Sequence, residues 1–217
     1  MYVAKHGEAP DGSPIHPKNV APCRPSDFVL EVGEGEGNRL DPYCAASDVK
    51  IHEDGSVAMG AGAVLALKGY SEGRHYWEFT AKVCGWYSFC GVCTKHPCDE
   101  EEIRRGYTLA EAEGAFCFAG CDPQVANHGR DPEPMSAFHA GREYNRNSIP
   151  PFLPGERVGV LLDCDKGSLS LFRNGNCVAA NCFVGWLRHQ DFYPAFGASG
   201  LQTEFTDIAF DLPVPEV

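Results

Sequence analysis

Hydrophobic and polar positions alternate with a period of two along much of this chain. The clearest case is the segment His75–Val83, where Tyr76, Glu78, Thr80 and Lys82 alternate with Trp77, Phe79, Ala81 and Val83. Because successive side chains of a β-strand point to opposite faces of the sheet, this alternation predicts a half-buried strand. Its apolar face carries Trp77.

Other short runs have strand character and are separated by turn residues. They lie at Val49–His52, Ser56–Ala58, Val64–Leu67, Ser88–Cys93, Ala115–Ala119, Arg157–Leu162, Ser168–Arg173, Phe192–Gly197 and Thr203–Phe210. Glu53–Gly55 predicts one hairpin. Asn174–Gly175 predicts another, because a type I′ turn needs positive φ at both central residues. Helical periodicity is weak and confined to Glu100–Glu113. Many short strands with glycine and proline turns predict an all-β fold, an antiparallel β-sandwich with little helix.

Three stretches interrupt this rhythm of strands and turns. Residues 1–27 hold five prolines and little apolar periodicity, which predicts a linker or extended arm before a domain at 28–217. Lys95–Gly114 and Gly120–Pro154 are longer than the roughly 12–15 residues usual for connections in a compact domain. Long connections often carry function, so they are the first candidates for a binding surface.

Charge and hydropathy exclude several classes of partner. The 217 residues include 30 acidic and 18 basic side chains, a formal net charge of −12. Nucleic acids and anionic membranes need a basic surface, so neither is expected as a partner. No run of 18 apolar residues exists to span a bilayer. The start of the chain lacks the apolar region of a secretory signal, and no Asn-x-Ser/Thr sequon occurs, so a cytoplasmic location is expected.

The chain contains 11 cysteines, which raises the question of metal binding or disulfides. Several occupy positions where a strand needs an apolar residue, namely Cys84, Cys90, Cys93, Cys117, Cys164 and Cys177. Zinc is the alternative, because Cys90 and Cys93 form a Cys-x-x-Cys pair. A strand places residues three apart on opposite faces, and no second such pair exists at a matching distance. Reduced thiols packed as small hydrophobic groups are therefore favoured, with no metal and no cofactor.

Five segments, in order along the chain, resemble a known family. Gly73–Phe79 is similar to the G-x-H-Y-W-E-V strand of SPRY domains, Arg157–Gly175 to their VGVLLDxxxGxLSFFxNG hairpin, and Phe192–Gly197 to their LYPAFG strand. Leu40–Pro42 and Ser47–Gly55 resemble the PRY segment that precedes SPRY in tripartite-motif proteins and butyrophilins. The resemblance divides the domain into a PRY-like segment, 28–70, and a SPRY core, 71–213.

The resemblance implies a bent, two-sheet antiparallel sandwich of the concanavalin-like kind, with no catalytic centre. It also implies a loop surface that binds a protein or peptide. In tripartite-motif proteins this domain recognises the target of a RING ubiquitin ligase; no RING-like array of cysteine and histidine exists here, so any ligase activity would lie outside this chain. Tyr2–Lys5 and Gly7–Pro14 resemble the last strand of a fibronectin type III module, which suggests the subclass that carries one. Oligomers are expected only through regions outside the chain.

Nothing in the sequence has the pattern of a catalytic site. The eight histidines are scattered over the arm, strand ends and connections, and no nucleophile elbow or zinc-hydrolase motif occurs. A Cys/His hydrolase is therefore the least favoured of the alternatives, which also include a lectin-like carbohydrate-binding sandwich and a purely structural spacer.

The candidate ligand-binding residues combine arginine with aromatic side chains, a composition typical of interaction hot spots. Those of the long connections are Tyr107, His128, Arg130, Phe138, Arg142, Tyr144 and Arg146. Trp186 and Arg188 form a second group, in the connection Val184–Asp191. The pattern leaves open which group binds the ligand and whether Trp186 instead caps the core.

Overall fold

The computed structural model describes residues 38–84, 88–94, 109, 114–120, 135–140 and 142–216, all within the compact unit Gly37–Val217. Regular structure in these ranges is almost entirely β-strand, which confirms the predicted all-β class. None of the helices in these ranges is long and apolar enough to cross a membrane. The predicted arm, 1–27, and nearly all of Glu100–Glu113 lie outside the described residues, and the domain boundaries stay a prediction.

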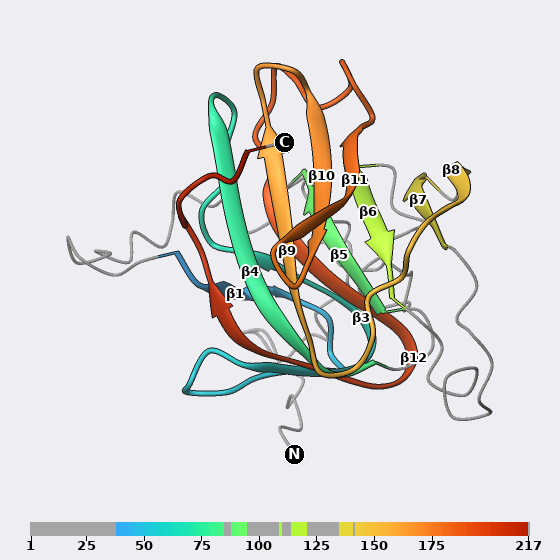
Figure 1. The fold of residues 1–217 in the computed structure, drawn as a ribbon. Helices are drawn as coiled ribbons and strands as arrows, with labels where there is room; N and C mark the ends of the chain where they lie inside the picture. Colours follow the sequence, from blue (N-terminus) through green and yellow to red (C-terminus); the bar gives the residue numbers. More distant parts are fainter. Residues whose placement is uncertain are drawn as a thin grey trace, which may run out of the picture. The chain divides into compact units, whose positions relative to one another are not determined.

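Every pair of neighbouring strands is antiparallel (Figure 1). The strands are β1 (Leu40–Ala45), β2 (Val49–Ile51), β3 (Val57–Ala66), β4 (Arg74–Val83), β5 (Ser88–Cys93), β6 (Ala115–Ala119), β7 (Met135–His139), β8 (Arg142–Ile149), β9 (Glu156–Asp163), β10 (Ser168–Arg173), β11 (Asn176–Cys182) and β12 (Tyr193–Ala209). Their order is β11-β10-β9-β4-β12-β5-β6-β7-β8, with β3 also on β12 and with β1 and β2 on β3.

The long strand β12 joins the two halves of this sheet. Its first part, Tyr193–Ala198, pairs with β5, whereas residues from Glu204 onward pair with β4. The register against β3 shifts between Ser199 and Thr203, where β12 passes from one set of partners to the other. The strands thus form one curled sheet. The predicted division into two separate sheets is not confirmed.

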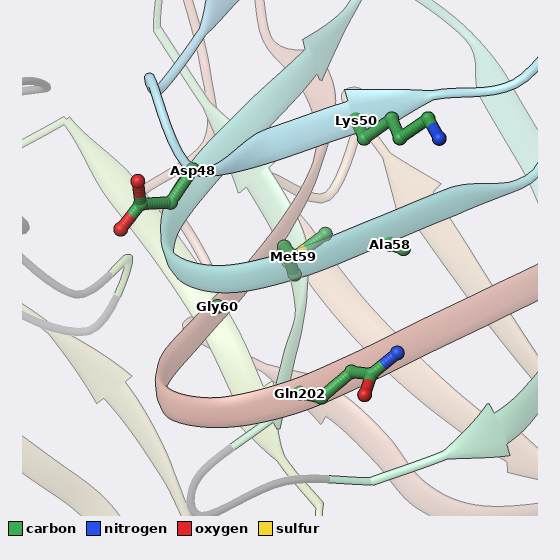
Figure 2. A pocket seen from close by; sticks show the side chains of 6 residues that line it. All are labelled: Asp48, Lys50, Ala58, Met59, Gly60 and Gln202. Carbon is green, nitrogen blue, oxygen red and sulfur yellow. The ribbon is translucent and has the colours of Figure 1, made fainter. Parts of the chain in front are cut away.

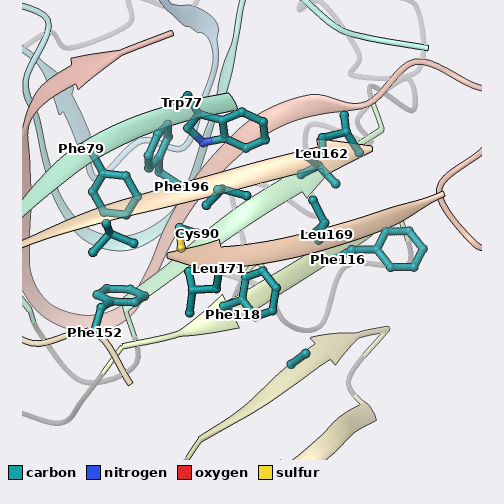
Figure 3. Packing of buried hydrophobic residues seen from close by; sticks show 14 of the residues in the cluster. Trp77, Phe79, Cys90, Phe116, Phe118, Phe152, Leu162, Leu169, Leu171 and Phe196 are labelled. Carbon is teal, nitrogen blue, oxygen red and sulfur yellow. The ribbon is translucent and has the colours of Figure 1, made fainter. Parts of the chain in front are cut away.

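The core lies between the inner faces of the two halves (Figure 3). Phe79 of β4 is fully buried, and its ring centroid is 4.7 Å from that of Phe205, 5.2 Å from that of Phe196 and 6.0 Å from that of Phe152. Leu171 of β10 and Phe118 of β6, on the opposing half, are buried in the same apolar cluster (Figure 3). Trp77, Phe79 and Ala81 of the alternating apolar residues of β4 therefore do face the core.

The outer face of β4 departs from the predicted pattern, because part of it is also buried. Tyr76 is 5% exposed and packs with Leu161 of β9 and Phe172 of β10, and Leu212 packs against this cluster. The segment after β12 covers the strand there, since the Leu212 N–H donates to the Tyr76 carbonyl (3.0 Å). Val83, expected on the buried face, is instead exposed at the end of β4.

Both predicted hairpins are confirmed by their geometry. β2 and β3 flank a turn in which Gly55 has φ of +80°, and Asn174 and Gly175 have φ of +48° and +79° between β10 and β11. The positive φ values of Asn174 and Gly175 are those that a type I′ turn requires at its two central residues.

Three predicted boundaries are wrong, and each error has the same cause. The runs Ser56–Ala58 and Val64–Leu67 belong to one strand, β3, and the last two runs of the chain belong to β12. Gly120–Pro154 is not one long connection, because it contains the β7–β8 hairpin. β7 pairs with β6. Pairing with a neighbour extends or creates each of these strands where local hydrophobicity alone gives no signal.

Candidate functional site

The connection between β11 and β12, residues 183–192, is anchored to the turn between β9 and β10. The backbone N–H groups of Trp186 and Leu187 each donate to the Gly167 carbonyl (3.2 Å), and that of Gly185 donates to the Lys166 carbonyl (3.0 Å). Leu187 is fully buried and packs into the main core, which fixes the connection to the domain. Trp186 is nevertheless 49% exposed. A well-anchored backbone thus presents a large aromatic side chain to solvent.

Trp186 packs edge-on against two aromatic rings of the β7–β8 hairpin. Its ring centroid is 5.4 Å from that of His139 and 5.5 Å from that of Tyr144. Phe116 and Phe183 lie beneath, with Phe116 stacked 4.0 Å from His139 and Phe183 5.5 Å from Tyr144. We call His139, Tyr144 and Trp186, with Phe116 and Phe183 beneath them, the Trp186 surface.

The register of the β7–β8 hairpin decides which of its side chains join this surface. Ala137 pairs with Tyr144 and His139 with Arg142, so these residues share one face. Phe138 and Glu143 form the pair between them and lie on the other face. Phe138 accordingly packs on Phe89, at 6.0 Å between centroids, in a separate apolar cluster.

The structure therefore brings together residues that the sequence left in two groups. Tyr144 and Trp186 are in contact, Arg142 is exposed on the face of β8 that carries Tyr144, and Arg188 is exposed beside Trp186. Tyr107, His128 and Arg130 lie outside the described residues, as does the side chain of Arg146 on β8. A binding role for all nine residues stays a prediction.

Sequence reasoning missed His139, Phe116 and Phe183. His139 could have been found from its place beside Arg142 and Tyr144 in an arginine- and aromatic-rich connection. Phe116 and Phe183 carry no such signal, since both are buried and have the appearance of ordinary core residues.

A shallow hollow of about 280 Å³ lies over β2, β3 and β12 (Figure 2). Its lining residues are Asp48, Lys50, Ala58, Met59, Gly60 and Gln202. Figure 2 shows the Asp48 and Lys50 side chains pointing away from one another, so they do not converge on a common ligand. The hollow includes none of the predicted site residues and lacks an aromatic platform.

The cysteines of β5 are arranged as the sequence predicted. Cys90 is buried in the main core, whereas Cys93 packs against the second apolar cluster on the other face. Burial raises the pKa of the Cys90 and Cys117 thiols, and it raises that of Cys164 to about 11, so all three are poor nucleophiles. Cys177 was expected to be buried and is exposed, because β11 is an edge strand. No group of three metal-ligating side chains occurs in the described ranges.

A protein-family model described as the SPRY domain matches residues 74–210, from the first residue of β4 to just past the end of β12. The chain belongs to the SPRY domain family. SPRY domains are generally protein-interaction modules, and the resemblance to this family is confirmed. The PRY-like segment, 28–70, lies before the matched residues and stays a prediction.

Two curated relatives place the SPRY domain beside an F-box. F-box/SPRY domain-containing protein 1 of Anopheles gambiae is 26% identical over 177 residues, covering 79% of this chain and 62% of that protein. The protein of the same name from Drosophila mojavensis is 26% identical over 183 residues, covering 79% and 64%. The chain thus spans less than two thirds of the length of these relatives. The expected tripartite-motif and fibronectin subclass is not confirmed, because these relatives carry an F-box name instead.

Solved structures support the SPRY fold. The SPRY domain of human HERC1 superposes with a TM-score of 0.58 at 17% identity, covering 81% of this chain and 99% of that one. The PSpry domain of TRIM65 gives a TM-score of 0.55 at 16% identity, covering 78% and 90%. At such identities the likeness concerns the fold alone.

Proposed function

We propose that this SPRY domain is a non-catalytic recognition module that binds a peptide or protein segment at the Trp186 surface. The observation that carries the proposal is the half-exposed Trp186 ring, packed on His139 and Tyr144 above an anchored backbone. Tryptophan and tyrosine are the residues most enriched among interface hot spots.

The rigidity of this surface favours binding. The Trp186 side chain is held against three aromatic neighbours, and its backbone hydrogen-bonds to the β9–β10 turn. Because these groups are already ordered, a partner would lose little additional conformational freedom from them on binding. An exposed but anchored aromatic side chain is thus better suited to recognition than a mobile one.

The relatives support a place for this module in a larger protein. Their names pair a SPRY domain with an F-box, and this chain covers less than two thirds of their length. We propose a cytoplasmic, ubiquitin-ligase-associated protein in which this domain selects the target. An F-box context is better supported than a tripartite-motif one.

A peptide-display selection tests the proposal. The immobilised chain is panned against a random 12-residue library, and enriched peptides are synthesised and titrated by fluorescence anisotropy. We expect Trp186→Ala and Tyr144→Ala to weaken binding at least tenfold, because truncating a hot-spot residue costs about 2 kcal/mol or more. Lys50→Ala, in the hollow of Figure 2, is the control and should leave binding unchanged.

Two results would overturn this function. One is a set of enriched peptides whose affinity is unaffected by Trp186→Ala and Tyr144→Ala, with both variants folded by circular dichroism. The other is the absence of enriched peptides together with specific hits on a glycan array, which would support the lectin alternative.

A further inference from the structure

The charges beside the Trp186 surface point to the chemistry of its partner. Resting on the function proposed above, we infer that the surface binds an acidic peptide segment. An apolar side chain of that segment lies against Trp186, and one or more of its carboxylates contact Lys166 and Arg188.

Lys166 and Arg188 are neighbours of Trp186 through the turn that anchors it. The Arg188 guanidinium donates from Nη2 to the Lys166 carbonyl oxygen (3.1 Å), and the next carbonyl, that of Gly167, accepts from the Trp186 N–H. Both cationic residues are exposed. Two positive charges therefore lie at the end of the β9–β10 turn on which Trp186 is anchored.

The acidic residues of the same turn are directed elsewhere. Asp163 is 5% exposed; one of its oxygens lies 3.5 Å from Arg74 Nε and the other accepts from the Lys166 N–H. Asp165 accepts from the Gly73 N–H (3.3 Å). Neither carboxylate is paired with the side chain of Lys166 or Arg188, and these two cations form no ion pair within the described part of the chain. No acidic side chain among the described residues therefore neutralises either charge.

Gly167 positions Arg188. A Cβ built on Gly167 would lie 2.8 Å from Arg188 Cγ and 3.0 Å from Nε, so the arginine stem runs directly over the glycine. Gly167 also has φ of +69°, which side chains rarely tolerate. The close approach and the bond to the Lys166 carbonyl order the guanidinium, whose remaining N–H groups can take a carboxylate in a bidentate manner.

A third cation lies near the other end of the surface. Arg142 is exposed and pairs across the hairpin with His139, whose ring contacts Trp186. Glu143 lies on the opposite face of β8, by the alternation of the strand. Arg142, Lys166 and Arg188 are thus three exposed cations on the elements that form the Trp186 surface, in a chain of net charge −12. An acidic partner segment would be drawn to this patch and repelled by most of the remaining surface.

The test uses the full chain and the same 12-residue display library, panned in parallel on the unaltered chain and on Lys166→Glu. We expect the peptides enriched on the unaltered chain to carry Asp or Glu within a few residues of an apolar side chain. Arg188→Glu and Lys166→Glu should each weaken an enriched peptide about tenfold. Lys50→Glu, an identical charge change on β2, should alter its affinity less than twofold. Replacing the peptide's acidic residues by their amides should abolish the effect of Arg188→Glu.

Arg188→Gln provides an independent variant that removes the guanidinium without introducing a negative charge. It should weaken acidic peptides while sparing their amide forms. Circular dichroism establishes that each variant is folded, and sedimentation velocity tests for self-association through the same surface.

The possible outcomes separate this inference from the proposed function. Peptides that are lost on Trp186→Ala but change less than twofold with both charge reversals would overturn the acidic partner and leave the recognition function in place. The acidic partner would also be overturned, and the recognition function kept, if neutral or basic peptides are enriched. A dimer that occupies the surface and is abolished by Trp186→Ala would have the same consequence. Insensitivity to Trp186→Ala as well would overturn both.

Discussion

Two tryptophans of this chain illustrate how position decides the role of a residue. Trp77 lies in the middle of β4, is 1% exposed and forms part of the core. Trp186 lies in a connection, is 49% exposed and rests on other aromatic rings. Since both side chains are large and apolar, the difference comes from the backbone that carries them.

This contrast predicts different effects on stability. Phe79→Ala, in the core beside Trp77, should lower the free energy of unfolding by about 3–5 kcal/mol, because it leaves a cavity among Phe152, Phe196 and Phe205. Trp186→Ala should lower it by about 1 kcal/mol or less, since half of the side chain is already in water. Urea unfolding followed by far-ultraviolet circular dichroism measures both. Equal losses would contradict the assignment of Trp186 to a binding surface.

At the scale of the element, β4 and β9 are joined by a polar network as well as by their backbones. The Tyr76 hydroxyl donates to one oxygen of Glu78 (2.7 Å), and Arg157 Nε donates to the other (2.8 Å). Partial burial by itself raises the pKa of Glu78, but these two donors outweigh it and the pKa is lowered. Burial is the largest cause of the raised pKa of Tyr76; the Glu78 carboxylate raises it further, whereas the Arg157 charge lowers it.

The lowered pKa of Glu78 predicts a pH dependence of stability. Unfolded Glu titrates near pH 4.3, to a first approximation, so the folded state gains stability from Glu78 above that pH and loses it as the pH falls through the lower folded value. Glu78→Gln removes this contribution. We expect the stability difference between the chain and Glu78→Gln to be largest near pH 7 and to shrink between about pH 5 and pH 3. Urea unfolding across this range measures it, and a difference independent of pH would refute the assignment.

At the scale of the whole domain, the described start and end of the chain are tied together. The Tyr70 hydroxyl donates to Asp211 (2.7 Å) and accepts from Asn38 (3.1 Å), and Lys68 pairs with Asp211 at 3.2 Å. Beyond Asp211 the chain runs along β4, where Leu212 covers the outer apolar cluster and Arg74 donates to the Pro215 carbonyl. The last residues thus complete the packing of the sheet.

Removal of residues 211–217 should therefore destabilise the domain without unfolding it. We expect the free energy of unfolding to fall by about 2–3 kcal/mol, as Leu212 and the surface that it covers on Tyr76 and Phe172 become exposed. Tyr70→Phe, which removes the hydroxyl bonds but keeps the segment, is the matched control and should lose about 1 kcal/mol. Differential scanning calorimetry measures both. A truncated chain as stable as the original would show that the segment does not contribute to folding.

The sequence by itself determined the elements whose signals are local. Alternation placed the apolar face of β4, and the Asn174–Gly175 pair placed a hairpin, because period-two burial and positive φ act over a few residues. The three SPRY-like motifs identified the SPRY family for the same reason. The local spacing of Cys90 and Cys93 was also sufficient to place them on opposite faces of β5.

Only the tertiary structure decided the composition of the site. Tyr144 and Trp186 are separated by three strands along the chain, and they meet because the edge strands β8 and β11 approach one another in the curled sheet. Phe138 lies on the face opposite Tyr144 because of the register of the β7–β8 hairpin. Tyr76 is buried because the residues after β12 cover the outer face of β4. Such contacts depend on pairing between distant segments, and no local pattern of residues encodes them.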